Sequence, residues 1–107
     1  MMQSICLEIV KWKSNEGVSD ADMIATVNGM VADLKGCEGF VHQSLYKNSE
    51  NEWVDIYYWE DEFCAHDSNQ YMADKDSLRL LLALIEPDSV SMEVLPLLQS
   101  SGELSVT

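Results

Sequence analysis

Four side chains in the strand-like segments of this sequence could carry acid–base chemistry: Glu8, His42, Asp55 and Glu93. Carboxylates that cluster in a partly dry site raise one another's pKa, and a raised pKa suits a general base. A histidine adds a group that titrates near neutral pH. This set could therefore take the proton of an acidic phenol or enol. The structural alternative is that the same groups hydrogen-bond across a buried interface.

Aromatic side chains form the second candidate set, because a flat ring can stack on a ring-shaped substrate. The candidate substrate-binding residues are Trp53, Tyr57, Trp59, Tyr46 and His66. Indole and phenol rings are also common fillers of cores and interfaces. A histidine next to an aspartate, as in His66-Asp67, is typical of a helix surface. Both interpretations remain open at the level of sequence.

These residues must be positioned by four strands and three helical segments. Alternating apolar residues predict strands over 4–13, 40–47, 52–59 and 89–95, with a turn at 48–51 between the middle two. Helical spacing predicts a helix that starts at Ser19 and ends at Gly36, a second over 61–72, and a short third over 76–85. The order β-α-β-β-α-β is the ferredoxin-like pattern, an α+β fold with helices on one face of an antiparallel sheet.

Each predicted strand has two faces, and their compositions lead to an expectation about what covers them. We expect the helices to cover the purely apolar face, made of Ile5, Leu7, Ile9, Val41, Leu45, Val54, Ile56, Tyr58, Val90, Met92 and Val94. The other face would carry Cys6, Glu8, Val10, Trp12, Phe40, His42, Ser44, Tyr46, Trp53, Asp55, Tyr57, Trp59, Ser91, Glu93 and Leu95. So large an aromatic patch is unusual on a monomer, and aromatic residues are enriched at interfaces. The second face therefore predicts a homodimer.

Composition sets broad limits on function. The 107 residues hold 19 acidic against 6 basic residues, a net charge of −13, which disfavours nucleic acid and anionic membranes as partners. No apolar run reaches the roughly 18 residues of a membrane span, and the start lacks the basic region of a signal peptide. Three scattered cysteines indicate neither a zinc site nor a dithiol and favour the cytoplasm. We expect one domain over 1–98 and a flexible tail over 99–107.

Three stretches resemble a known family. LEIVKWK at 7–13, KGCEGFVHQSLYKNSENEWVDIYYWED at 35–61 and LIEPDSVSMEVL at 84–95 are similar to the antibiotic biosynthesis monooxygenase-like (ABM-like) group of dimeric α+β barrels. The resemblance implies a homodimer that forms through the open sheet face and a small-molecule cavity on the sheet side of each protomer. It also implies a small-molecule-handling domain, with a monooxygenase that needs no cofactor and acts on a phenolic or quinonoid compound as the preferred function.

Two alternatives stay open beside that function. The first is a non-enzymatic homodimeric binding or assembly module, which a barrel centre filled by Trp12, Trp53 and Trp59 would favour. The second is a heme-binding or heme-degrading relative. Heme-degrading members of the family use an Asn on the first strand, a Trp near the end of the third and a His on the second helix. Trp59 and His66 fit, but Cys6 and Glu8 stand where the Asn would be. No metal site is predicted.

Overall fold

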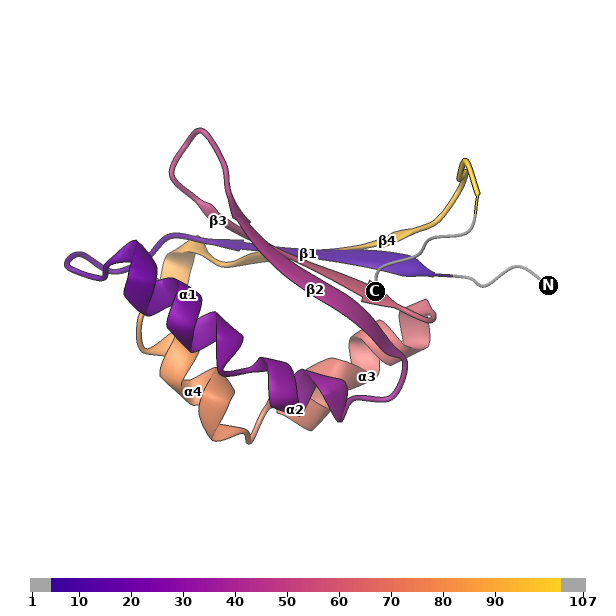
Figure 1. Ribbon diagram of the computed structural model, residues 1–107, viewed down its shortest axis with the longest axis horizontal. Coiled ribbons are helices and arrows are strands. Elements are labelled where there is room, and N and C mark those ends of the chain that lie inside the picture. Colours follow the sequence, from indigo (N-terminus) through magenta and orange to yellow (C-terminus); the bar gives the residue numbers. More distant parts are fainter. Residues whose placement is uncertain (1–4, 103–107) are drawn as a thin grey trace.

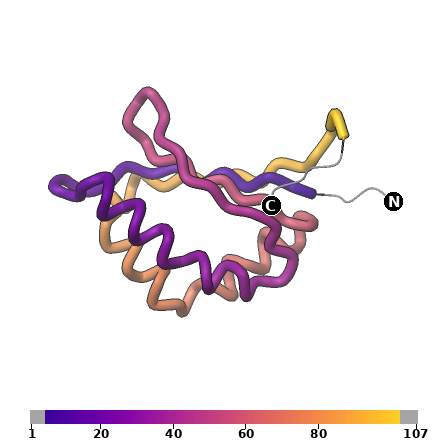
Figure 2. The backbone as a smooth tube through the Cα atoms, in the orientation of Figure 1, coloured from indigo at the N-terminus to yellow at the C-terminus, as the bar shows by residue number. Residues whose placement is uncertain are grey.

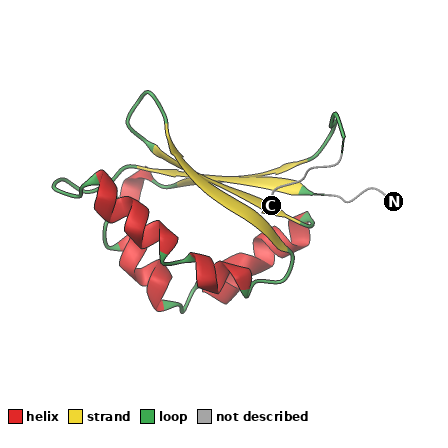
Figure 3. Ribbon diagram, in the orientation of Figure 1, coloured by secondary structure: helices red, strands yellow, loops and turns green. Residues whose placement is uncertain are grey.

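A computed structural model describes residues 5–102, and its sheet confirms the predicted ferredoxin-like fold (Figure 1). The four antiparallel strands stand in the order β2-β3-β1-β4. Figure 2 follows the same path as a tube, and Figure 3 shows the helices gathered on one side of the strands. The elements are β1 (Cys6–Trp12), α1 (Asp20–Asn28), α2 (Val31–Lys35), β2 (Phe40–Lys47), β3 (Trp53–Trp59), α3 (Glu62–Met72), α4 (Asp76–Leu82), a 3₁₀ turn η1 (Pro87–Ser89) and β4 (Ser91–Pro96).

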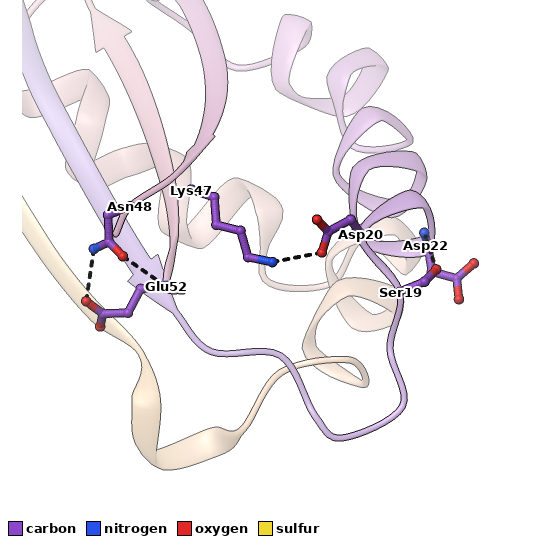
Figure 4. Close-up of polar contacts among 6 residues, drawn as sticks. All are labelled: Ser19, Asp20, Asp22, Lys47, Asn48 and Glu52. Atoms are coloured by element: carbon purple, nitrogen blue, oxygen red, sulfur yellow. Dashed lines mark hydrogen bonds and ion pairs between the residues drawn. The ribbon is translucent and has the colours of Figure 1, made fainter. Parts of the chain in front are cut away.

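Local side-chain caps explain where several elements begin. The Ser19 hydroxyl accepts a hydrogen bond from the Asp22 N–H at 3.1 Å and starts α1. In the β2–β3 turn, the Asn48 side-chain oxygen accepts from the Glu52 N–H at 2.9 Å, and Lys47 at the end of β2 binds Asp20 at 2.8 Å (Figure 4). The Lys47–Asp20 ion pair ties the hairpin to the start of α1.

The boundaries differ from the predicted ones in three places. The first helix is two helices, because the chain breaks between α1 and α2 at Gly29 and Met30. The third helix ends at Leu82 rather than at residue 85, and the last strand starts at Ser91 because η1 occupies the preceding residues. The predicted flexible tail lies partly outside the described residues, in 103–107. Within residues 5–102, no helix is long and apolar enough to cross a membrane.

The helices cover the aromatic face of β1 and β3, so the predicted assignment of these two strands is wrong. Cys6, Glu8 and Trp12 of β1 are buried against the helices with Trp53, Asp55, Tyr57 and Trp59 of β3. The β1 and β3 residues predicted to be covered are only half-buried on the open face; within the two strands these are Leu7, Ile9, Val54, Ile56 and Tyr58. Both sets of side chains are apolar enough to form a hydrophobic core. Assigning the wrong face to a strand therefore exchanges all of its buried and open-face side chains. The larger aromatic side chains take the core because they bury more area.

For β2 and β4 the paired residues lie on the predicted sides of the sheet, with one exception, but Met92 is 51% and Val90 41% exposed, so the predicted cover over these two is wrong. Leu45 is paired with Asp55, Met92 with Val10 and Val94 with Glu8. Paired residues of neighbouring strands point to the same face, so Leu45, Met92 and Val94 lie on the helix side. His42, Ser44, Tyr46, Ser91, Glu93 and Leu95 lie on the open face, as expected. The exception is Phe40. An irregularity in the pairing between Phe40 and His42 places Phe40 opposite Trp59, with the two rings 5.6 Å apart in an edge-on contact.

Candidate functional site

A group of polar side chains lies in the interior between the sheet and the helices. We call it the interior polar cluster, and its members are Glu8, Gln43, Asp55, Tyr57 and Trp59. Three neighbouring strands supply them, since Tyr57 of β3 is paired with Glu8 of β1 on one side and with Gln43 of β2 on the other. The period of two along each strand brings these side chains to one face.

Asp55 is at the centre of the cluster and is fully buried, with 0% exposure. Gln43 Nε2 donates a hydrogen bond to Asp55 Oδ1 at 2.6 Å, and the Tyr57 hydroxyl donates to Oδ2. Burial raises the pKa of Asp55 from 3.8 to about 6, the Gln43 and Tyr57 hydrogen bonds oppose this rise, and the charge of Glu8 adds to it. A carboxylate that titrates near neutral pH can act as a general base.

Glu8 is the second buried carboxylate, with 3% exposure. Trp59 Nε1 donates a hydrogen bond to Glu8 Oε1 at 2.9 Å. Burial raises the pKa of Glu8, while the Trp59 hydrogen bond and the nearby His66 lower it. The pKa of Tyr57 is raised well above its ordinary value, first by burial and then by the charge of Asp55. Tyr57 therefore stays protonated and donates to Asp55.

A surface groove of about 300 Å³ reaches this interior between α3 and β4. It is lined by Glu8, Glu62, His66, Asn69, Met92, Glu93 and Val94. Glu8 is the one member of the interior polar cluster in this lining, so it joins the cluster to the surface. The volume is at the lower end of the range for small-molecule sites, which begins at roughly 300 Å³.

The structure brings together some of the predicted site residues and separates others. Glu8, Asp55, Tyr57 and Trp59 meet in the cluster. His42 and Tyr46 lie on the opposite face of the sheet, where His42 stacks on Tyr58 with 6.1 Å between the ring centres. The prediction that His42 shares a face with Asp55 is therefore wrong.

Glu93 and Glu8 lie on neighbouring strands, but the prediction that they share a face is wrong. Glu93 is opposite Ile9 in the sheet, so its backbone position belongs to the open face. It lines the groove because β4 is an edge strand next to α3. His66, on α3, lines the same groove and lies 3.5 Å from Glu62.

Sequence reasoning missed three features of the interior. Gln43 has no motif, although its parity with Leu45 places it on the helix side. Trp12 and Trp53 were assigned to a subunit interface, but they are 1% and 4% exposed inside the protomer. Among the described residues neither indole N–H has a hydrogen-bond acceptor. An unpaired buried donor costs about 1–3 kcal/mol, so these two N–H groups are a local cost to stability.

Among the described residues, neither the interior nor the groove offers side chains suited to bind a metal ion or heme. Within residues 5–102, no group of three or more His, Cys, Asp or Glu side chains could hold a metal ion. For heme, the groove beside His66 presents three carboxylates, which would repel the propionates of heme. All three cysteines are free and buried, and burial is the first cause that raises the pKa of each thiol.

Comparison with solved structures shows the fold of this chain. No protein-family model matches the sequence, and no curated protein matches it significantly. Among solved structures, SnoaB, a cofactor-independent oxygenase from Streptomyces nogalater, is similar with a TM-score of 0.70 at 15% identity, over 94% of this chain and 99% of SnoaB. A protein of unknown function from Nitrosomonas europaea gives a TM-score of 0.71 at 12% identity, over 96% and 98% of the two chains.

A third similar structure carries the name of the resembled group. It is a protein from Chloroflexus aurantiacus that is provisionally named an antibiotic biosynthesis monooxygenase, with a TM-score of 0.67 at 16% identity, over 92% of this chain and 98% of the other. The resemblance to the ABM-like group is thus confirmed at the level of the fold. At these identities the shared fold does not transfer an activity.

Proposed function

We propose that this domain, which shares its fold with a cofactor-independent oxygenase, is itself a cofactor-independent monooxygenase acting on a phenolic or quinonoid compound. The observation that carries the proposal is Asp55, a fully buried carboxylate with a pKa of about 6. In this proposal Asp55 takes the proton of an acidic phenol. The resulting phenolate transfers one electron to O₂, and the two radicals combine to a hydroperoxide on the ring carbon. Loss of water from this hydroperoxide leaves a quinone carbonyl, so the substrate supplies all the electrons and the second oxygen atom leaves as water.

The neighbours of Asp55 support the same chemistry. Trp53 is two residues away on the same face of β3, about 6–7 Å along the strand, and Trp12 is opposite Trp53 on β1. Their unpaired indole N–H groups would donate to a ring oxygen as it becomes negative. Tyr57 and Gln43 hold the Asp55 carboxylate in place.

The test is oxygen uptake with a panel of polycyclic phenols and hydroxyquinones. We expect the rate to rise with pH around a midpoint of about 6, because a general base must be ionised to act. Asp55→Asn should remove the activity, typically by 10²–10⁴-fold for a general base. Asp88→Asn, the same change at an exposed position in η1, is the matched control. Full activity in Asp55→Asn would refute the role of Asp55.

We also propose that a second copy of the chain covers the open face of the sheet. This face carries half-buried apolar side chains, among them Leu7, Ile9, Val54, Ile56, Tyr58 and Leu95. The β2–β3 hairpin and the segment after β4 both rise on this side, away from the helices (Figure 1). Native mass spectrometry should give twice the chain mass of 12.1 kDa, and Ile56→Lys should give a folded monomer. A wild-type monomer would refute the dimer.

A binding module without catalysis is the second candidate, and the packing of the core favours it. Trp12, Trp53 and Trp59 fill the space between sheet and helices, each at most 4% exposed. Ligand binding without oxygen uptake across the panel would support this candidate over the enzyme. Under either function, the three buried free thiols suit a reducing compartment such as the cytoplasm.

A further inference from the structure

The groove between α3 and β4 is lined mainly by acidic side chains where it is ionisable. Its ionisable lining consists of three carboxylates, Glu8, Glu62 and Glu93, and one imidazole, His66. No lysine or arginine is part of the lining. His66 is 3.5 Å from Glu62 and its side chain is 61% exposed, so one solvated imidazole faces three acids. A site of this kind repels anions and attracts cations.

Glu8 adds a second and independent observation. Its side chain is 97% buried, and its Oε1 already accepts the hydrogen bond from Trp59. No described residue donates a hydrogen bond to the other oxygen, Oε2. This oxygen is not sealed in the core either, since Glu8 lines the groove. An ionised carboxylate only accepts hydrogen bonds, so the partner missing from Glu8 is a donor.

The rest of the lining decides what kind of donor fits. Among the described residues no group of His, Cys, Asp and Glu is arranged to hold a metal ion, so a bare divalent cation is a poor candidate. An ammonium group needs no fixed coordination geometry and carries up to three N–H donors. Met92 and Val94 line the same groove and offer apolar contact to a carbon skeleton.

From this geometry we infer that the α3–β4 groove binds the protonated amino group of a small organic ligand, with Glu8 as the acceptor and Glu93 as a further negative charge at the edge of the groove. The inference rests on the proposed function only where it makes this ligand the substrate, which would then be a phenol that carries an amine. Binding of the amine itself needs no turnover. The two proposals can therefore fail separately.

The experiment compares matched amines and alcohols on the full chain. Tyramine and tyrosol share a phenol ring and differ in a terminal ammonium or hydroxyl, and butylamine and butanol form the same pair without the ring. Binding is followed in proton–nitrogen NMR by the Trp59 indole N–H resonance, because this N–H donates to Glu8. The resonance is assigned by its loss in Trp59→Phe.

We expect each amine to shift this resonance and to bind about tenfold more tightly than its alcohol, as for a hydrogen bond to a charged group. Glu8→Gln should weaken tyramine binding about tenfold, and Glu93→Gln, which removes a charge at the edge of the groove, should weaken it less. Glu8→Gln keeps an oxygen for the Trp59 N–H, and Glu93 is exposed, so at least one variant reports on a folded protein. Glu16→Gln, an exposed position outside the groove, is the control for net charge.

Three results would overturn the inference. Equal affinity for amine and alcohol would show that the ammonium is not recognised. An equal loss in Glu16→Gln would show attraction by the overall charge of −13 rather than by a site. No response to any amine would show that the groove binds none. If amines bind but no panel compound consumes oxygen, the proposed function alone fails; if a neutral phenol is oxidised without preference for amines, this inference alone fails.

Discussion

Replacing Asp55 by Asn should make the protein more stable at high pH, although it removes the proposed base. Asp55 is fully buried and its pKa is raised from 3.8 to about 6 on folding. An acid with a raised pKa holds its proton more firmly in the folded state than in the unfolded state. The free energy of unfolding therefore falls as the pH rises from about 4 to about 6, and it does not recover above that range.

The size of the effect follows from the two pKa values. A difference of 2.2, from about 6 and 3.8, corresponds to about 3 kcal/mol at pH 8, since one pKa unit is about 1.36 kcal/mol. At pH 5 the folded protein still keeps most of the proton, and the same relation gives about 1.6 kcal/mol. The advantage of Asp55→Asn over wild type should thus grow by about 1.4 kcal/mol between pH 5 and pH 8.

The Asn side chain can be accommodated by the existing partners. Its oxygen can accept one of the two present donors, and Gln43 can turn its amide so that its oxygen accepts from the new NH₂ group. Any loss of hydrogen-bond quality is nearly independent of pH, so it shifts both measurements alike. Urea unfolding at the two pH values measures the difference.

Asp88→Asn is again the control, since it removes one charge from the surface of a strongly acidic protein. Its stability difference from wild type should change little over the same pH range. The reasoning would be refuted if the advantage of Asp55→Asn were the same at pH 5 and pH 8, or if Asp88→Asn gained as much. Either outcome would mean that the buried carboxylate carries no special cost.

Two further predictions concern the backbone before β2 and the hydrogen bonds of Asp55. Gly39→Ala should destabilise the fold by about 2 kcal/mol or more, because Gly39 has a φ of 79° and a Cβ there would be 2.5 Å from Cys64 Sγ. Gly17→Ala has a similar φ of 89° but meets no atom within 4 Å, so urea unfolding should show a loss of about 1 kcal/mol; equal losses would contradict the steric argument. Tyr57→Phe removes a hydrogen bond that lowers the pKa of Asp55, so the pKa of this carboxyl, followed by carbon NMR, should rise above about 6; an unchanged pKa would contradict this role of Tyr57.

The element order could be predicted because its signals are local. Ser19 and Asp61 accept hydrogen bonds from the N–H groups of the first helical turns, and such caps are readable from a few neighbouring residues. The β2–β3 turn is similarly local, with Asn48 accepting from Glu50 and Glu52 and with Asn51 at a positive φ of 67°. The alternation in the flanking segments then predicts strands.

Which site residues share a face was partly predictable, because the alternation of side chains along a strand is also a local signal. The period of two puts Asp55, Tyr57 and Trp59 on one face of β3 whatever covers that face. Pairing with β1 adds Glu8. Unbroken alternation from Phe40 predicts that His42 shares this face, but the pairing shifts between these two residues, so Phe40 is opposite Trp59 and His42 is opposite Tyr58. A bulge of this kind leaves no reliable mark in the sequence.

Local sequence is enough to tell which residues form strands and helices and which side chains of a strand share a face, because backbone sterics and local hydrogen bonds act over a few residues. The face that the helices cover depends on the packing of the whole chain, since β1 and β3 present two faces that are both apolar enough to be buried. That choice moved Glu8 and Asp55 from an expected subunit interface into the protomer's own interior. Burial there, rather than their residue type, is what raises their pKa values.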